Sequence, residues 1–228
     1  MARDPAEQRE RMVERQLRRR GISDEKVLEA MASVPRERFV PEDQVRRAYY
    51  DGALPIGLGQ TISQPWIVAA IAQALALKGR ERVLDVGSGS GYSTAVLAAL
   101  AKEVIGVERV SELAERSREL LSELGVDDVE IIAADGSEGL SDRAPFEAIA
   151  VHATAPGPPR ELIGQLTPGG RLVVPVAGRR ADMLTVFQRT GEELDLDAGT
   201  GIETWSLGPT RFVPLIGRAG FRSQREEG

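Results

Sequence analysis

Apolar and polar positions follow a helical spacing in two segments near the start of the chain. Residues 5–20 carry charges of alternating sign around a few apolar positions, which predicts an amphipathic helix that Gly21 ends in a left-handed cap. A second helix is predicted to be capped by Ser23 and to end before Pro35. The following segment, residues 36–66, contains several prolines and glycines and is predicted to be an irregular arm. Long loops in compact proteins often carry function.

From there onward, short apolar runs alternate with helical patterns. The predicted elements are a helix over 67–76, a strand ending at 83–86, a helix over 90–101, a strand over 103–108, a helix over 111–124, strands over 129–134 and 146–151, a helix over 159–166 and a strand over 171–176. This alternation predicts an α/β fold with a doubly wound, mostly parallel sheet. Two later apolar stretches, 183–188 and 211–216, predict an antiparallel pair at one edge. We divide the chain into N-terminal helices and arm, 1–78, packed on a core, 79–228.

The junction between the first strand and its helix carries the clearest candidate chemistry. It reads Val83-Leu84-Asp85-Val86-Gly87-Ser88-Gly89-Ser90-Gly91-Tyr92. Glycines at such a turn let the backbone approach a ligand, and the following helix points its amide dipoles there. A dinucleotide motif needs a glycine where Tyr92 stands, and Asp85 would repel a pyrophosphate. S-adenosylmethionine carries a sulfonium and an ammonium group and no phosphate, so the turn favours this cofactor.

Two further acids end predicted strands of the same sheet. Glu108 ends the second strand, where an acid accepts hydrogen bonds from ribose hydroxyls, and Asp135 closes the third strand before Gly136. Because the carboxyl ends of parallel strands form the ligand crevice, Asp85, Glu108 and Asp135 are expected on one face. This ordered set of acids favours a cofactor site over the generic glycine turn of many α/β proteins.

The composition narrows the chemistry. The 228 residues include no cysteine and one histidine, which excludes disulfides, thiolate nucleophiles, zinc clusters and histidine pairs, and no metal site is predicted. The formal net charge of -6 argues against a general nucleic-acid-binding surface. The first residues lack the apolar core of a signal peptide, and no apolar run reaches membrane-spanning length. We therefore expect a cytoplasmic monomer without a nucleic-acid or membrane partner.

The basic run Arg18, Arg19 and Arg20 has two interpretations. It could contact nucleic acid, or it could be a solvated helix face whose arginines complement the helix dipole. The acidic residues that precede the run favour the solvated face.

The arm provides the most specific sequence signal. Its residues Leu54-Pro55-Ile56-Gly57-Leu58-Gly59-Gln60-Thr61-Ile62-Ser63-Gln64-Pro65-Trp66 resemble those of the protein-L-isoaspartate O-methyltransferase family, and the resemblance runs from about residue 10 to residue 217. The other matching segments are Val34 to Pro41, Tyr50-Asp51, Asp135-Gly136, Ala144 to Phe146, Leu166 to Leu172 and Arg211 to Leu215. The resemblance implies a Rossmann-like class I methyltransferase fold with an N-terminal helical extension and arm.

The resemblance also implies an activity and a set of site residues. Family members use S-adenosylmethionine, which becomes S-adenosylhomocysteine, to methylate the α-carboxylate of isoaspartyl residues in damaged proteins and peptides. The ester closes to a succinimide, and hydrolysis returns some normal aspartate. Ser63 is implied to be catalytic, with Thr61 nearby. The residues implied to bind the cofactor are Gln60, Thr61, Ile62, Ser63, Asp85, Gly87, Ser88, Gly89, Glu108, Arg109, Asp135 and Gly136.

This activity agrees with a chain that offers almost no candidate for a catalytic base, since it has one histidine and no cysteine. A carboxylate with a pKa of about 4 is ionised at neutral pH, so the nucleophile needs no base. Ser63 would then hydrogen-bond the acceptor carboxylate. Its alternative role is to cap the helix that starts at Pro65, unless Gln64 is the cap.

Two positions depart from the family pattern. His152 stands where the family usually has small residues, either as a structural side chain or as a group that tunes acceptor binding with pH. Ile216 stands where some relatives carry a hydroxyl-bearing residue, so a contact with cofactor or substrate at this position is left open. The rival functions are a carboxyl methyltransferase acting on another aspartate-containing peptide or small acid, and a cofactor-binding module without activity.

Overall fold

The computed structural model describes residues 4–222. The helices are α1 (Pro5–Met12), α2 (Glu25–Ser33), α3 (Pro65–Leu75), α4 (Tyr92–Ala98), α5 (Ser111–Glu123) and α6 (Arg160–Gly164). The strands are β1 (Leu54–Gly57), β2 (Gln60–Ile62), β3 (Arg82–Val86), β4 (Glu103–Glu108), β5 (Val129–Ala133), β6 (Phe146–Val151), β7 (Leu166–Val176), β8 (Asp182–Arg189) and β9 (Ile202–Thr210). Residues 1–3 and 223–228 lie outside the described range. The expectation of no signal peptide rests partly on the first of these segments, and the predicted core of 79–228 ends in the second.

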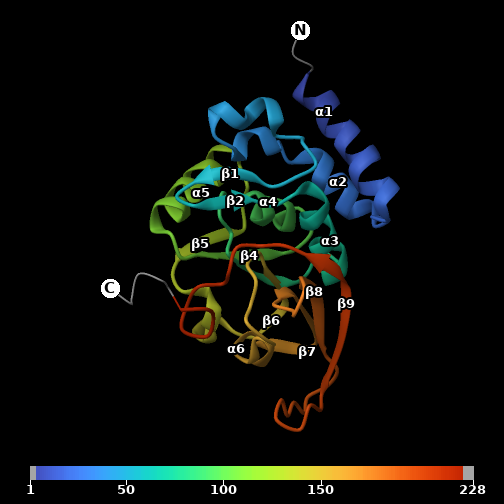
Figure 1. The fold of residues 1–228 in the computed structure, drawn as a ribbon, viewed down its shortest axis with the longest axis vertical. Helices are drawn as coiled ribbons and strands as arrows, with labels where there is room; N and C mark the ends of the chain where they lie inside the picture. Colours follow the sequence, from blue (N-terminus) through green and yellow to red (C-terminus); the bar gives the residue numbers. More distant parts are fainter. Residues whose placement is uncertain (1–3, 223–228) are drawn as a thin grey trace.

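A seven-stranded sheet in the order β5-β4-β3-β6-β7-β8-β9 forms the centre of the molecule (Figure 1). The strands from β5 to β7 are parallel, whereas β8 runs antiparallel to β7 and β9 runs antiparallel to β8. This confirms the α/β class with a mostly parallel sheet and an antiparallel edge. The strand order reverses between β3 and β6, which makes their carboxyl ends the switch point of the sheet.

Apolar residues on the two faces of the sheet form separate clusters. One cluster joins the sheet to the N-terminal helices and to α3, α4 and α5, and the other joins it to α6. Figure 1 shows the blue N-terminal helices gathered beside α3. The N-terminal extension is thus packed against the sheet through α3, while the division into 1–78 and 79–228 stays a prediction.

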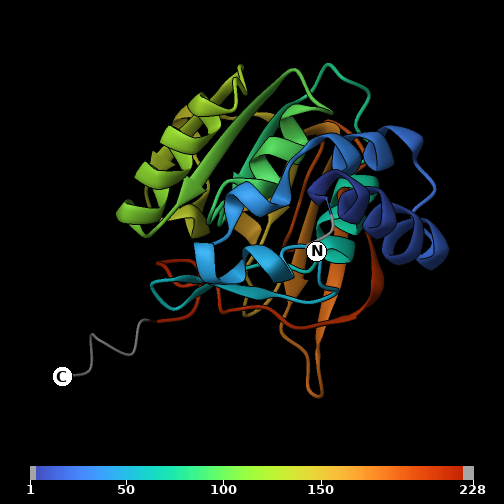
Figure 2. The same cartoon turned by 90° about the horizontal axis from the view of Figure 1, so that it is seen from above.

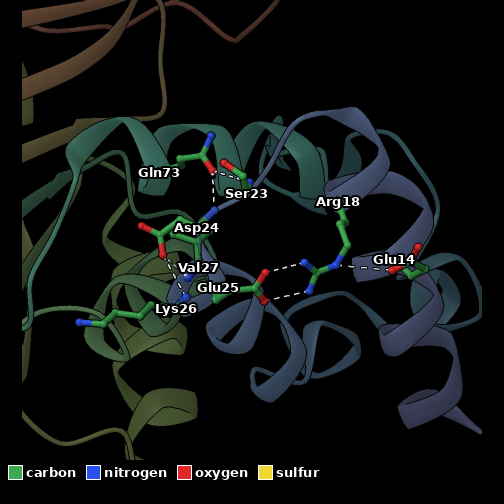
Figure 3. A network of polar contacts seen from close by, with 8 residues as sticks. All are labelled: Glu14, Arg18, Ser23, Asp24, Glu25, Lys26, Val27 and Gln73. Carbon is green, nitrogen blue, oxygen red and sulfur yellow. Dashed lines mark hydrogen bonds and ion pairs between the residues drawn. The ribbon is translucent and has the colours of Figure 1, made fainter.

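The predicted N-terminal helix is confirmed, with a change of winding towards its end. α1 continues as a π-helical turn over Val13–Leu17 and a 3-10 turn over Arg18–Arg20, and Gly21 ends it at a φ of 92°. The prediction that Ser23 caps the second helix is wrong. Asp24 is the N-cap of α2, because its carboxylate accepts hydrogen bonds from two amides of the first turn, as Figure 3 shows.

Figure 3 also shows how Arg18 is bound. Its guanidinium donates to both carboxylate oxygens of Glu25, at 2.5 and 2.9 Å, and lies 3.6 Å from Glu14. In the same network, the Oε1 atom of Gln73 on α3 accepts hydrogen bonds from the amides of Ser23 and Asp24. Arg18 therefore ties the first helix to α2, and the absence of a nucleic-acid partner stays a prediction.

The arm is more regular than the sequence predicts. β1 and β2 pair as an antiparallel hairpin, with an irregular register between Pro55 and Gly57. The predicted strand over 211–216 is wrong. Within residues 4–222 the last strand is β9, and residues 211–216 instead form an irregular segment with an isolated bridge between Thr154 and Pro214. Figure 2 shows the cyan hairpin and the red C-terminal segment on the same side of the molecule.

Within residues 4–222, no helix is long and apolar enough to cross a bilayer.

Candidate active site

A cavity opens beyond the carboxyl ends of β3 and β6, at the switch point of the sheet. Its walls come from the arm, the glycine turn, the end of β4, the end of β6 and the C-terminal segment. The sequence-predicted residues that line it are Gln60, Thr61, Ile62, Ser63, Gly87, Ser88, Gly89, Glu108, Arg109 and Gly136. We call this space the donor cavity. The structure therefore brings together side chains that the sequence places more than 70 positions apart.

The glycine turn forms the floor of the donor cavity. Gly87 and Gly89 have φ angles of 76° and 55°, and the amides of Gly87 and Ser88 both donate to the carbonyl of Val107. Gly91 has a φ of 86° and is the N-cap of α4, so this helix begins two residues later than predicted. A Cβ on Gly91 would overlap with the hydroxyl of Ser117 on α5. Glycine at this position thus permits both the left-handed backbone and the close packing.

Glu108 is the acid that reaches the donor cavity directly. Its carboxylate accepts hydrogen bonds from the Gly89 amide at 3.0 Å and from the Val110 amide at 2.8 Å. The side chain therefore holds the glycine turn against the end of β4 and still lines the cavity.

Asp85 lies beneath the cavity floor and has no exposed surface. One carboxylate oxygen accepts hydrogen bonds from the hydroxyls of Ser93, at 2.9 Å, and Thr94, at 2.6 Å. The other oxygen lies 3.1 Å from Nε2 of His152. The sequence places the acid correctly at the strand end but does not show that side chains of α4 and β6 surround it. A direct contact between Asp85 and a ligand stays a prediction.

Asp135 likewise interacts mainly with the protein's own backbone. Its carboxylate accepts hydrogen bonds from the amides of Ser137, at 2.9 Å, and Arg218, at 2.8 Å. Burial alone would raise the pKa of Asp135, but these hydrogen bonds outweigh it and lower the pKa. Its neighbour Gly136 lines the donor cavity, while Asp135 joins the end of β5 to the C-terminal segment. The role of Asp135 in cofactor binding stays a prediction.

Ser63 follows β2 and precedes α3. Gln64 is the N-cap of α3 and Pro65 is its first residue, so the alternative that Ser63 caps this helix is wrong. Within the described part of the chain, the Ser63 hydroxyl makes no hydrogen bond. It is therefore available to a ligand in the cavity that it lines.

Arg36 supports the site from behind Ser63, a role that was not predicted from the sequence. Its side chain is fully buried; Nε donates to the carbonyl of Ala48, and Nη2 donates to the carbonyl of Ser63, both at 2.8 Å. The guanidinium also lies 4.8 Å from the ring centre of Tyr92. Burial lowers the pKa of Arg36. One arginine thus joins the middle of the arm, at Ala48, to its end at Ser63. The sequence offers no signal for this role, because Arg36 stands beside Glu37 and Arg38 in a charged run.

A second cavity adjoins the donor cavity. Its own lining consists of Arg20, Ala53, Gln64, Trp66, Ile67, Pro209, Thr210, Arg211 and Phe212. The two cavities share Thr61, Ser63, His152 and Val213. Arg20 is anchored here, because it pairs with Asp51 and lies 5.0 Å from the ring centre of Trp66. We call this second space the acceptor groove.

Comparisons with known proteins agree with this arrangement. A model of the family described as protein-L-isoaspartate(D-aspartate) O-methyltransferase matches residues 7–220. A protein-L-isoaspartate O-methyltransferase of Methanoculleus marisnigri is 46% identical over 226 residues, which cover 98% of this chain and 99% of the relative. A protein-L-isoaspartate O-methyltransferase 2 of Marinobacter nauticus is 50% identical over 220 residues, which cover 96% of this chain and 97% of the relative.

Solved structures give the same result. A crystal structure of the Plasmodium falciparum enzyme of this description, in complex with S-adenosyl-L-homocysteine, superposes with a TM-score of 0.75 at 30% identity. The match covers 91% of this chain and 98% of the other. A further structure described as protein-L-isoaspartate O-methyltransferase has a TM-score of 0.81 at 26% identity. The match covers 93% of this chain and 67% of the other.

Proposed function

The chain belongs to the protein-L-isoaspartate(D-aspartate) O-methyltransferase family, and we propose that its two cavities bring donor and acceptor together at Ser63. The enzyme methylates the α-carboxylate of L-isoaspartyl residues in damaged peptides and proteins, with S-adenosylmethionine as the methyl donor. The ester then closes to a succinimide, whose hydrolysis returns some normal aspartate. One observation supports placing the reaction at Ser63: Thr61 and Ser63 line both cavities.

The donor cavity offers suitable groups to S-adenosylmethionine, which supplies a methyl group activated by a sulfonium. The Ser88 hydroxyl is buried and has no partner among the described residues, so it is free to bond a ligand. The Glu108 carboxylate can accept about four hydrogen bonds and accepts two from the backbone, so acceptor sites are left for ribose hydroxyls. Gly136 would face the adenine from the end of β5.

The acceptor side requires positioning rather than proton transfer. The isoaspartyl carboxylate is already ionised at about pH 7, so no side chain has to remove a proton. We assign Ser63 to donate its hydroxyl proton in a hydrogen bond to this carboxylate, with Thr61 beside it. Holding oxygen, methyl carbon and sulfur in line while excluding water accounts for rate enhancement without a charged catalytic group.

Nothing in the site favours a different acid or a module without activity. The hydroxyl of Ser63 and the arm that holds it are intact, and the acceptor groove extends from this point to the surface. We propose peptides and damaged proteins as partners because the family acts on them and because the acceptor groove is partly open to solvent. A monomeric state and a cytoplasmic location stay predictions.

Methylation of matched peptides tests the proposed function. The purified protein is incubated with methyl-labelled S-adenosylmethionine and with one of two peptides that differ only in an isoaspartyl or an aspartyl residue. We expect base-labile label on the isoaspartyl peptide and almost none on its partner. Equal labelling of both, or label only on another carboxylate, would overturn the proposal.

A further inference from the structure

His152 occupies the point where the donor cavity meets the acceptor groove. It follows β6, and its amide donates to the carbonyl of Val86 at the end of β3, so it bridges the switch point of the sheet. Its Cβ lies close to the position that a Cβ of Gly87 would occupy. The side chain lines both cavities although it is mostly buried. His152 is thus one of the four residues that line both cavities, with Thr61, Ser63 and Val213.

Asp85 lies next to this imidazole. Nε2 of His152 lies 3.1 Å from one carboxylate oxygen of Asp85, which is within ion-pair distance, but neither atom makes a hydrogen bond within the described residues. The second carboxylate oxygen is held by Ser93 and Thr94, so the carboxylate cannot turn away without breaking two hydrogen bonds. The two side chains form an ion pair only when the imidazole carries a proton on both nitrogens.

The remaining ring nitrogen is available to a ligand. Nδ1 of His152 makes no hydrogen bond to any described residue, and it is not among the buried polar atoms that lack a partner. The nitrogen opposite Asp85 therefore faces the space that the side chain lines. In a protonated imidazole, both ring nitrogens are donors.

We propose that His152 binds the isoaspartyl carboxylate as an imidazolium held by Asp85, and that acceptor affinity consequently falls as pH rises. This inference rests on the proposed function. The pair of Asp85 and protonated His152 is neutral, so it does not repel the sulfonium of the donor. When His152 loses its proton, Asp85 is uncompensated and the hydrogen-bond donor on Nδ1 is lost, so both changes weaken binding of an anionic acceptor.

The effect falls on binding more than on the chemical step. Methyl transfer converts the carboxylate to a neutral ester, so a cation that stabilises the carboxylate interacts less with the transition state than with the bound acceptor. Loss of the charge on His152 therefore raises KM and does not lower kcat.

Several other charged or titratable groups face the same space. They are Glu108 and Arg109 at the end of β4, Tyr92 at the start of α4, Arg20 after the first helix and Arg211 after β9. Asp85 is the only one of the described carboxylates within 4.0 Å of His152. Histidine is the side chain that ordinarily changes charge between about pH 5 and 8, which identifies His152 as the group to follow in this range.

The single histidine of the chain makes the test direct. Untagged protein with a 15N-labelled imidazole is titrated by NMR with S-adenosylhomocysteine, alone and together with a saturating isoaspartyl or aspartyl peptide. A tenfold preference of the acceptor for protonated His152 moves the titration midpoint up by about one pH unit, because binding and protonation are linked. We expect this rise with the isoaspartyl peptide. An unchanged midpoint, or an equal rise with the aspartyl peptide, would overturn the inference.

Two variants give an independent test by kinetics. In the wild-type enzyme we expect KM for the isoaspartyl peptide to rise roughly tenfold across the titration of His152, without a fall in kcat. His152→Asn should make KM high and independent of pH, and Asp85→Asn should move the rise to lower pH because the imidazolium loses its opposite charge. A wild-type KM profile in His152→Asn would contradict the proposal.

The control is Thr154→Val, two residues along the chain, whose hydroxyl bonds to Asp182 outside both cavities. It should keep the wild-type pH profile. S-adenosylhomocysteine affinity and thermal unfolding confirm that each variant is folded. If the wild type methylates no isoaspartyl peptide, the proposed function fails; if it does so with unchanged pH behaviour in His152→Asn, only the role of His152 fails.

Discussion

At the scale of single residues, Ser63 has a free hydroxyl and a fixed backbone. The hydroxyl has no partner within the described chain, while the carbonyl of the same residue accepts a hydrogen bond from the buried Arg36. The side chain is thus available to a ligand from a position that the protein determines. Such preorganisation reduces the reorganisation needed when the acceptor arrives.

The first prediction concerns the hydroxyl itself. Ser63→Ala removes a hydrogen bond to a charged acceptor, a contact that contributes about 1.5–3 kcal/mol. We expect kcat/KM for the isoaspartyl peptide to fall by about 10- to 100-fold, while affinity for S-adenosylhomocysteine changes by less than about threefold. Steady-state kinetics and calorimetry measure the two quantities. An unchanged kcat/KM would refute the assigned role.

The second prediction concerns Arg36, which holds the backbone of Ser63. Arg36→Lys retains a charge but cannot bridge the carbonyls of Ala48 and Ser63 in the same way as the planar guanidinium. We expect at least about tenfold lower kcat/KM, with thermal stability also reduced because a buried hydrogen-bonded group is lost. The control is Arg38→Lys, on the same turn, whose exposed side chain contacts Glu123 and should leave activity unchanged.

Added guanidinium ion gives a second readout for this position. If Arg36 acts by holding the arm, guanidinium should restore part of the activity to a folded Arg36→Ala variant. It should not restore activity to Ser63→Ala. Restoration of both variants alike would contradict a specific role for Arg36.

Residue roles were only partly predictable from the sequence. The sequence identified Asp85, Glu108 and Asp135 as acids at strand ends, but only Glu108 lines the donor cavity. Asp85 is surrounded by side chains of α4 and by His152 after β6, and Asp135 is bonded by the C-terminal segment. These contacts join positions far apart in the chain. The buried Arg36 escaped notice for the same reason.

At the scale of elements, buried parallel strands were predicted best. β4 and β6 have the predicted bounds, because each is a continuous apolar run between polar turns. The β1–β2 hairpin was missed because Pro55 and Gly57 interrupt the usual alternation. The mostly apolar residues 211–216 have the composition of a strand, but residues 213–216 line the donor cavity instead of forming a strand of the sheet.

The third prediction tests the turn that starts α4. Gly91→Ala forces a left-handed alanine and overlaps with the Ser117 hydroxyl, so we expect a loss of about 1–3 kcal/mol in the free energy of unfolding. Gly125→Ala, at a φ of 65° with no neighbouring atom within 4 Å, should lose less. Denaturant unfolding measures both. Ser117→Ala should recover part of the loss in the first variant, and no recovery would argue against the steric cause.

At the scale of the whole molecule, stability should depend on pH through hydrogen-bonded carboxylates. Glu81 accepts three backbone hydrogen bonds from the turn before β3, at 2.9 to 3.0 Å. Burial raises its pKa, but the backbone hydrogen bonds prevail and lower it. A lowered pKa in the folded state stabilises the fold above the unfolded pKa of about 4.3, and this contribution is lost as pH falls through the folded value.

The fourth prediction follows from this sign. Glu81→Gln should lower the free energy of unfolding by about 1 kcal/mol at about pH 7, and the difference from wild type should shrink towards zero as acid protonates the wild-type carboxylate. Glu119→Gln is the control, because Glu119 lies on the exposed face of α5 and has no partner among residues 4–222, and it should have little effect at either pH. A difference for Glu81→Gln that grows in acid would contradict this account.

The whole fold places donor and acceptor in adjoining cavities that meet at Ser63 and His152. The most direct test is a crystal structure of the enzyme with S-adenosylhomocysteine and an isoaspartyl peptide. We predict the cofactor product in the donor cavity and the peptide in the acceptor groove, with the isoaspartyl carboxylate within hydrogen-bond distance of the Ser63 hydroxyl. A peptide bound elsewhere, with its carboxylate remote from Ser63, would contradict the account.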